Sequence, residues 1–433
     1  MEKFYHDDNP IIRIIVWLIL LPAVAQIPFS NSLQAESQPL TCQTWIETIT
    51  EHHPELLTVK KEIDVQTALM KAQNSYSSGD LNFSIENFGG AAEFSRLNQS
   101  ELTLSYQNIL PVNLVFTLNQ NKSQLEIQKL MIEYQRLKQS ILLSLTTLLV
   151  EKQKIISLQT LIDQEKIYND SLIDVQKKGV ILGRYNSLDT LIFKQIRYEI
   201  LMRSSELEAM NVNCQKQFQI LSALNGLNIQ HTNNLSLDSI PLLPELDSLK
   251  LLSANSFDHQ LIEIDRKINL IELKIAAKER YAPPTFNLGW RYFNSERNYA
   301  WILEFCWSLP QFKQNNYYQQ SKLRTSEKIA LNQKNNTTNQ EIELIQRYQE
   351  IASLSQQIAI LENQILPNYF QIQRQTKELL LKGAIPIQTL YELQLSYIEN
   401  KSRLIEKKSE YLATYFALYA QLGQLNSLEV ILK

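Results

Sequence analysis

Residues 286–293, Phe-Asn-Leu-Gly-Trp-Arg-Tyr-Phe, decide the fold because apolar side chains alternate with polar or small ones as far as Tyr292. Aromatic or aliphatic side chains occupy every second position: Phe286, Leu288, Trp290 and Tyr292. Asparagine, glycine and arginine hold the positions between them. This alternation predicts a β-strand with one apolar and one polar face, because successive side chains of a strand point to opposite sides. The segments on either side have helical patterns, so this strand interrupts an otherwise helical chain.

Three more segments alternate in the same way, and with the first they form two predicted hairpins. The predicted strands are 80–88, 101–107, 285–293 and 300–308. Self-comparison explains the pairing, because residues 53–88 align without a gap on residues 258–293, a shift of 205 positions (258 minus 53). Leu56 then meets Leu261, and Asn82 meets Asn287. The sequence therefore predicts a duplicated order of helix, hairpin, long helix and helix.

Very long helices account for most of the remaining chain. Glycine is scarce, with 9 residues in 433, and these leave long glycine-free stretches typical of helices. The segments 113–178 and 316–382 repeat apolar residues at helical spacing, and Pro367 is expected to kink the second one. A helix of about 65 residues is about 100 Å long, so each needs neighbours along its length.

Composition limits the function classes. The net charge of −3 argues against a nucleic-acid partner, which requires a basic surface. The three cysteines are widely spaced and odd in number, so they indicate neither a disulfide framework nor a metal site. No phosphate loop, nucleophile elbow or catalytic cluster occurs, so we expect no enzyme activity and no cofactor.

The first 25 residues have the features of a secretory signal. An apolar run of about a dozen residues follows two basic residues and ends in Ala23-Val24-Ala25, an A-x-A cleavage motif. The run is too short to span a bilayer as a helix. A buried N-terminal helix is the alternative interpretation, since Glu2, Asp7 and Asp8 make the leader less basic than usual.

An apolar strand face needs an apolar environment. A soluble sandwich is one possibility, but four strands in two separated hairpins, with no other β signal, make a poor one. Membrane-spanning strands alternate between lipid-facing apolar and inward-facing polar side chains. Open sheet edges are not tolerated in hydrocarbon, so several copies would have to pool their strands, and three copies give twelve. The residues expected to face lipid are Leu81, Phe83, Ile85, Leu102, Leu104, Tyr106, Phe286, Leu288, Trp290, Tyr292, Trp301, Leu303, Phe305 and Trp307.

Several short motifs follow this plan. Leu-Pro steps come after the second strand of each hairpin, in NILPVN (108–113) and WSLPQF (307–312), and ILPNY occupies 365–369. Two helix-turn segments, LGRYNSLDTL (182–191) and KGAIPIQTLYEL (382–393), each carry a glycine before an apolar run. In these motifs and in its duplicated order the chain resembles the TolC family of outer-membrane efflux channels, over nearly its whole mature length.

The resemblance implies a homotrimer with a 12-stranded β-barrel on a long α-helical barrel. It also implies an outer-membrane location in a Gram-negative-type cell, with most of the chain in the periplasm. Partners would be outer-membrane lipid, a periplasmic membrane-fusion adaptor and an inner-membrane pump of RND or ABC type. The adaptor contact or gate would lie at the helical tips, at Gly183, Arg184, Asp189, Gly383 and Thr389. Thr389 stands where the family frequently has an acid.

We therefore expect a mainly α protein with a small β part. Its divisions are a signal peptide (1–25), a first repeat (26–226, hairpin 80–108), a linker or equatorial segment (227–254) and a second repeat (255–433, hairpin 285–308). Its expected function is a passive exit duct for efflux or type I secretion. The alternative is a periplasmic coiled-coil adaptor or scaffold without a membrane barrel, which predicts a single helical hairpin between compact β domains. An enzyme on a helical scaffold is a third interpretation.

Overall fold

The computed structural model describes residues 49–73, 79–90, 94, 96–110, 115–183, 187–222, 237, 240–279, 283–307, 312–381 and 385–425. All of them belong to one structural unit, Pro39–Lys433. The predicted signal peptide, 1–25, lies outside the described residues.

The chain is mostly helical with one small antiparallel sheet, as the sequence predicts. A short helical turn at 49–52 precedes the first long element. The elements in chain order are α3 Pro54–Gln73, β1 Asp80–Glu86, β2 Glu101–Ile109, α4 Val115–Ile181, α5 Ser187–Ser222, α6 Leu246–Ser253, α7 Phe257–Lys278, β3 Thr285–Phe293, β4 Asn298–Cys306, α8 Phe312–Ile360, η3 Leu361–Ile365, α9 Leu366–Leu381 and α10 Ile387–Gln421.

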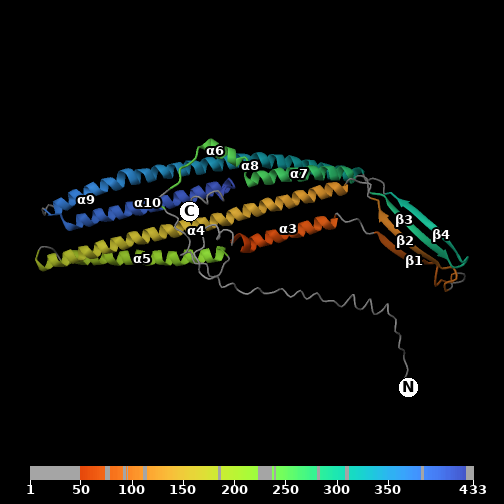
Figure 1. Cartoon of the computed structure of the whole chain (residues 1–433), viewed down its shortest axis with the longest axis horizontal. Helices are drawn as coiled ribbons and strands as arrows, with labels where there is room; N and C mark the ends of the chain where they lie inside the picture. Colours follow the sequence, from red (N-terminus) through yellow and green to blue (C-terminus); the bar gives the residue numbers. More distant parts are fainter. Residues whose placement is uncertain are drawn as a thin grey trace, which may run out of the picture. The chain divides into compact units, whose positions relative to one another are not determined.

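Helix α4 is the central element of the bundle. It has 67 residues, which corresponds to about 100 Å at 1.5 Å per residue. Helices α3, α5, α7 and α10 all pack against it, and α8 packs against α7 and α10 (Figure 1). Most of the stability of a helix in a protein comes from packing against its neighbours, so these contacts along α4 stabilise it.

Three apolar clusters hold the helices together. The largest joins α4, α6, α8 and α10 around fully buried residues such as Ile351 and Phe416. A second lies where α3, α4 and α5 meet, around Leu145 and Phe218. A third, with Phe193 and Tyr391, joins α4, α5 and α10. The core is therefore a series of clusters along the bundle.

A charged residue ties three of the four helices that adjoin the sheet, α4, α7 and α8. The carboxylate of Glu272 on α7 lies 2.7 Å from the Lys122 ammonium of α4 and 2.6 Å from the Lys322 ammonium of α8. Burial raises the pKa of Glu272, but the hydrogen bonds and charges of the two lysines outweigh it and lower the pKa on balance. The pair of bonds fixes the positions of α4 and α8 on α7.

The four strands form one sheet in the order β1-β2-β3-β4, with every neighbouring pair antiparallel (Figure 1). The two predicted hairpins are joined by β2 and β3, which pair over the whole length of both strands. The sheet therefore brings together segments that lie almost 180 residues apart, since β2 ends at Ile109 and β3 begins at Thr285 (285 minus 109 is 176).

Near Pro367, where the sequence predicts a kink, the second long helix contains the π-helical segment η3, which ends two residues before the proline. Two other details differ from expectation. Part of the predicted linker 227–254 forms helix α6, and β4 begins at Asn298, two residues earlier than predicted.

Candidate functional site

The register of the sheet places the predicted lipid-facing residues of the strands on one face. Residues opposite each other in neighbouring strands share a face, and the register gives continuous apolar rows. The rows are Leu81–Tyr106–Leu288–Leu303, Phe83–Leu104–Trp290–Trp301 and Ile85–Leu102–Tyr292–Tyr299, with Phe286 opposite Phe305. Trp307 lies one residue beyond the end of β4.

These apolar side chains have little cover in the single chain. Leu303 is 78% exposed, and Leu81 and Trp301 are each 72% exposed. Aromatic rings gather on the face, with Trp290 stacked on Tyr292 at a centroid distance of 6.1 Å. An exposed apolar patch of this kind marks an interaction surface, because soluble surfaces rarely keep such patches uncovered.

The opposite face of the sheet is polar and internally bonded. The Arg291 guanidinium donates to the Glu101 carboxylate and to the Thr103 hydroxyl, each at 3.1 Å. The Asn287 amide donates to the Glu304 carboxylate at 3.3 Å. These bonds link the side chains of neighbouring strands across the polar face.

Gly289 sits at the centre of the polar face, opposite Ser105. A Cβ atom at this position would lie 2.8 Å from the Cβ of Ser105 and 3.3 Å from the Leu104 carbonyl oxygen. Glycine therefore permits a close approach of β2 and β3. It explains the single small residue in the alternating stretch of β3.

Both outer strands have one edge without a partner among the described residues. β1 pairs only with β2, and β4 pairs only with β3. An unpaired edge presents a row of N–H and C=O groups that can continue the sheet into another chain. Among the described residues, the sheet therefore has two edges at which pairing could continue.

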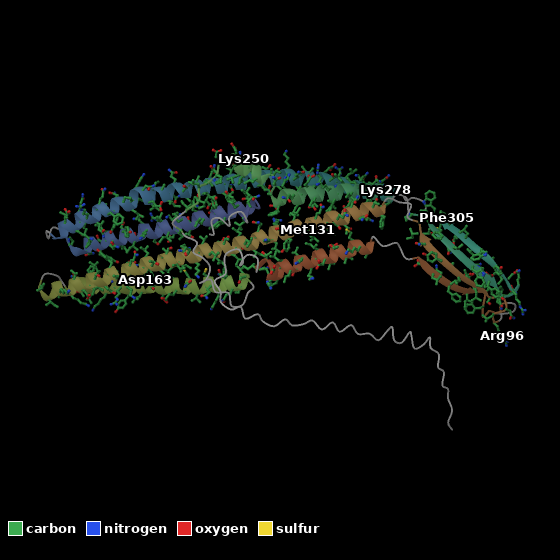
Figure 2. All side chains as sticks on the ribbon, in the orientation of Figure 1. Arg96, Met131, Asp163, Lys250, Lys278 and Phe305 are labelled. Carbon is green, nitrogen blue, oxygen red and sulfur yellow. The ribbon has the colours of Figure 1, made fainter. Side chains whose placement is uncertain are left out.

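The two ends of the sheet differ in what they join. Short connections link the sheet to α3, α4, α7 and α8 at one end, where Phe305 lies close to the helices in Figure 2. At the other end the β1–β2 loop carries Arg96 (Figure 2). The Asn294 amide of the β3–β4 turn donates to the Leu97 carbonyl of that loop at 2.7 Å. The turns at this end are thus bonded to each other.

The predicted tip residues are only partly within the described residues. Gly183 ends α4 with a positive φ of 68°, a conformation that favours glycine. Asp189 lies in the first turn of α5, with its side chain outside the described atoms, and Arg184 and Gly383 are outside the described residues. Thr389 lies in the first turn of α10, where its N–H donates to the Pro386 carbonyl at 3.2 Å. Pro386 is the N-cap of α10.

A buried polar stripe on α4 was not predicted. The Glu165 side chain is 1% exposed and accepts a bond of 2.7 Å from Arg203 of α5. Asn169, one turn later, is buried and donates to the Phe193 carbonyl at 3.2 Å. Burial, with a contribution from the charge of Glu165, raises the pKa of Tyr391 to about 12. Only the helical spacing of Glu165 and Asn169 along one face of α4 hinted at this arrangement.

A groove of about 370 Å³ lies beside this stripe between α4, α5 and α10. Its floor is apolar, and Arg203, Glu399 and Arg403 stand among its walls. Within the described part of the chain, no group of three or more His, Cys, Asp or Glu residues is arranged to hold a metal ion. No described helix combines the length and the apolar character needed to cross a bilayer.

Comparisons with known proteins agree on the fold. No protein-family profile and no curated protein sequence matches the chain. Among solved structures, the MtrE outer membrane channel of Neisseria gonorrhoeae in its open state matches with a TM-score of 0.71 at 10% identity, over 88% of this chain and 89% of that one. The CmeC outer membrane channel of Campylobacter jejuni matches with 0.66 at 11% identity, over 90% and 89%. The outer membrane protein VceC of Vibrio cholerae matches with 0.67 at 16% identity, over 88% and 95%.

The chain thus has the fold of outer-membrane channel proteins, over nearly the full length of each of these structures. The resemblance to the TolC family that the sequence motifs suggest is confirmed at the level of the fold. At these identities the likeness says nothing about substrate or partner.

Proposed function

We propose that three copies of this chain form a passive outer-membrane channel. The channel serves as the exit duct of a tripartite efflux or type I secretion system, and an adaptor and a pump open it at the helical tips. The observation that carries the proposal is the four-stranded sheet, with one exposed apolar face and both outer edges unpaired.

The dimensions of the strands support insertion in a bilayer. Strands of nine residues span about 30 Å at 3.4 Å per residue, and at a tilt of about 40° they cover about 23 Å. This height fits the apolar band of about 25 Å that is typical of outer-membrane barrels. The polar face would then line the water-filled interior.

Three copies would leave no unpaired sheet edge in the lipid. Hydrocarbon cannot hydrogen-bond the free edges of β1 and β4, so the edges have to be paired between chains. Twelve strands give a closed barrel of even strand number. Since both hairpins begin and end at helices, every helix would lie on one side of the membrane, in the periplasm.

The order of elements supports two structural repeats. Helix, two strands and two helices occur twice, as α3-β1-β2-α4-α5 and as α7-β3-β4-α8/α9-α10. We propose that 26–226 and 255–433 are these repeats, that 227–254 is an equatorial segment between them, and that 1–25 is removed on export. The scaffold alternative predicts a single hairpin of helices between compact β domains, whereas this chain has two helical hairpins and one sheet.

The first experiment tests membrane location and assembly. The full-length protein is expressed in a Gram-negative host, and outer membranes are separated and extracted with detergent. We expect a heat-modifiable oligomer that forms conducting pores in planar lipid bilayers. Recovery as a soluble monomer that forms no pores would contradict the proposal.

We also propose that the turns around Gly183 and Gly383 contact the adaptor and close the duct, with Arg184, Asp189 and Thr389 beside them. Exposed apolar residues near the first turn support a docking surface: Ile181 is 83% exposed, and Leu182 and Leu188 are exposed too. Charge reversal at Asp189 should change efflux or conductance without preventing trimer assembly. If both efflux and conductance stay unchanged, the proposed role of this turn as adaptor contact or gate is wrong.

A further inference from the structure

The groove between α4, α5 and α10 has the size of a small-molecule site. Its volume is about 370 Å³, and ligand pockets in proteins measure about 300–1,000 Å³. On α10 its lining runs from Ile398 to Glu406, a distance of eight residues (406 minus 398), or about 12 Å at 1.5 Å per residue. These dimensions fit a compact organic molecule.

The floor of the groove is apolar. Leu161 and Ile162 of α4 and Ile398 of α10 are buried, and Leu158 and Leu207 complete the apolar lining. Buried side chains of this kind keep their positions, because protein interiors are closely packed. An apolar body placed on this floor would be removed from water, which favours its binding.

Met210 gives the α5 wall an adaptable surface. Its side chain lines the groove and is 55% exposed. The methionine side chain is flexible and polarizable, and its sulfur makes favourable contacts with aromatic rings. Exposed methionines are also common at surfaces that bind ligands of several shapes. This wall therefore suits an apolar or aromatic ligand.

One of the two arginines in the lining is already neutralised. The guanidinium of Arg203 on α5 lies 2.7 Å from the carboxylate of Glu165 on α4, whose side chain is 1% exposed. Separating such a pair is costly, because it leaves a buried charge without compensation. Arg203 is therefore not free to receive an anionic ligand.

The remaining charges of the walls are mostly negative. Glu206 of α5 and Glu399 and Glu406 of α10 line the groove, and all three are exposed. Arg403 of α10 is the positive charge that remains beside them, so the balance is −2 (−3 plus 1). In the described part of the chain none of these four side chains has an ion-pair partner. Carboxylates around an apolar floor are complementary to a positively charged ligand with an apolar body.

We propose that this groove binds small amphiphilic cations, molecules with an apolar or aromatic body and one positive charge. The apolar body lies on Leu161, Ile162 and Ile398, and the charge faces the carboxylates of the walls. Charge separates this class from neutral ligands, which lack the attraction, and from anions, which are repelled. The inference goes beyond the proposed function, because the groove lies within one chain and its use requires neither a pore nor a membrane.

The test compares two ions of the same shape and opposite charge. Tetraphenylphosphonium is a cation and tetraphenylborate an anion, and each carries four phenyl rings around its central atom. Binding to the full-length protein in a non-ionic detergent is measured by equilibrium dialysis against protein-free detergent. We expect saturable binding of one phosphonium ion per chain.

Three variants change the charge of α10 and leave the apolar floor intact. Glu399→Gln should weaken phosphonium binding about threefold and strengthen borate binding about as much, since a single partly exposed charge contributes modestly. Arg403→Gln should have the reverse effect. Glu392→Gln is the matched control, because it removes the same charge from the same helix, seven residues or about two turns before Glu399 and outside the groove. It should change neither affinity.

A fourth variant tests the place of binding. Ser402 lines the groove from α10, so Ser402→Trp would fill part of the groove with an indole ring. Phosphonium binding should fall at least tenfold, while the melting temperature stays close to that of the wild type. If this variant melts at a much lower temperature, the charge variants alone decide the question.

Several results would overturn the proposal. They are the absence of saturable phosphonium binding, equal affinities of the wild type and the two groove-charge variants, changes in the same direction for both ions, and full binding by a well-folded Ser402→Trp. Binding by separated copies but not by the assembled oligomer would also overturn it, because a second copy would then cover the groove. If the protein forms no pores and still binds the phosphonium ion as expected, the channel proposal fails and the cation site stands.

Discussion

Replacing Leu303 and its neighbour Ile302 by arginine separates a lipid-facing sheet from a water-exposed one. The two residues are adjacent on β4 and point to opposite faces, Leu303 on the apolar face and Ile302 on the polar face beside Gly289. Both are aliphatic, so the same substitution changes size and charge almost equally. Leu303 is 78% exposed in the single chain, and Ile302 is half-buried.

If the apolar face lies in lipid, Leu303→Arg should destabilise the protein more than Ile302→Arg. If the sheet is exposed to water, the order should be reversed. Near the bilayer midplane an arginine on the lipid face costs about 2–4 kcal/mol, so three copies of Leu303→Arg lose about 6–12 kcal/mol per trimer. Ile302→Arg puts its charge on the face that water reaches, where we expect at most about 1 kcal/mol per copy. In a water-soluble sheet the exposed Leu303 would tolerate arginine within about 0.5 kcal/mol, and the half-buried Ile302 would be the more sensitive position.

The assay is the stability of the assembled protein in outer membranes. We would measure the temperature at which the oligomer dissociates on a gel, the urea midpoint, and the amount recovered in the outer-membrane fraction. Leu303→Arg should lower all three strongly, and Ile302→Arg should stay close to the wild type. Equal effects of the two variants, or greater damage from Ile302→Arg, would refute the reasoning from the apolar face.

Three further predictions concern the sheet and the bundle. Gly289→Ala should cost about 1–3 kcal/mol in unfolding free energy, because its Cβ would lie 2.8 Å from that of Ser105; a wild-type urea midpoint would contradict this. Leu145→Ala empties a fully buried position and should cost about 2–5 kcal/mol, seen as a lower melting temperature, whereas Leu331→Ala at an exposed site should change little. Glu272→Gln should destabilise the helices at neutral pH, and the difference from the wild type should shrink on acidification. Because lysine bonds lower the folded-state pKa below its ordinary 4.5, the stability they give is present above that pH and is lost as pH falls through the folded value, which thermal melts across pH can measure.

Much of the architecture follows from local patterns that the sequence displays openly. Alternation in 286–293 predicts a strand, and the same alternation in three other segments predicts the composition of both faces. Scarce glycine and helical spacing predict long helices, and Pro367 predicts a kink in the second. Each of these features depends only on residues that are close in sequence, so the sequence is sufficient to predict it.

Contacts between distant segments were harder to predict. The pairing of β2 with β3 joins the two hairpins into one sheet, and nothing within either hairpin specifies that register. The Lys408–Glu362 bridge and the Arg203–Glu165 pair each connect different helices. In the sequence these residues look like ordinary charges on a helix surface, where a solvated face is the usual interpretation.

The proposed site could be predicted in composition but not in detail. The residues of the apolar face follow from alternation, and Tyr299 joins them because β4 starts earlier than expected. That lipid covers this face remains a prediction, as does the role of the tips, since Arg184 and Gly383 lie outside the described residues. Short turns between helices have no periodicity from which their conformation can be inferred.

The free edges of β1 and β4 have a consequence for how the protein matures. In the proposed assembly a newly made copy cannot complete its own hydrogen bonding, so its final folding step is a meeting between molecules. The rate of that step would rise with the number of copies in the periplasm, and a lone copy would be exposed to degradation. A low concentration of newly made copies would therefore lower the amount of assembled protein, even for the wild-type sequence.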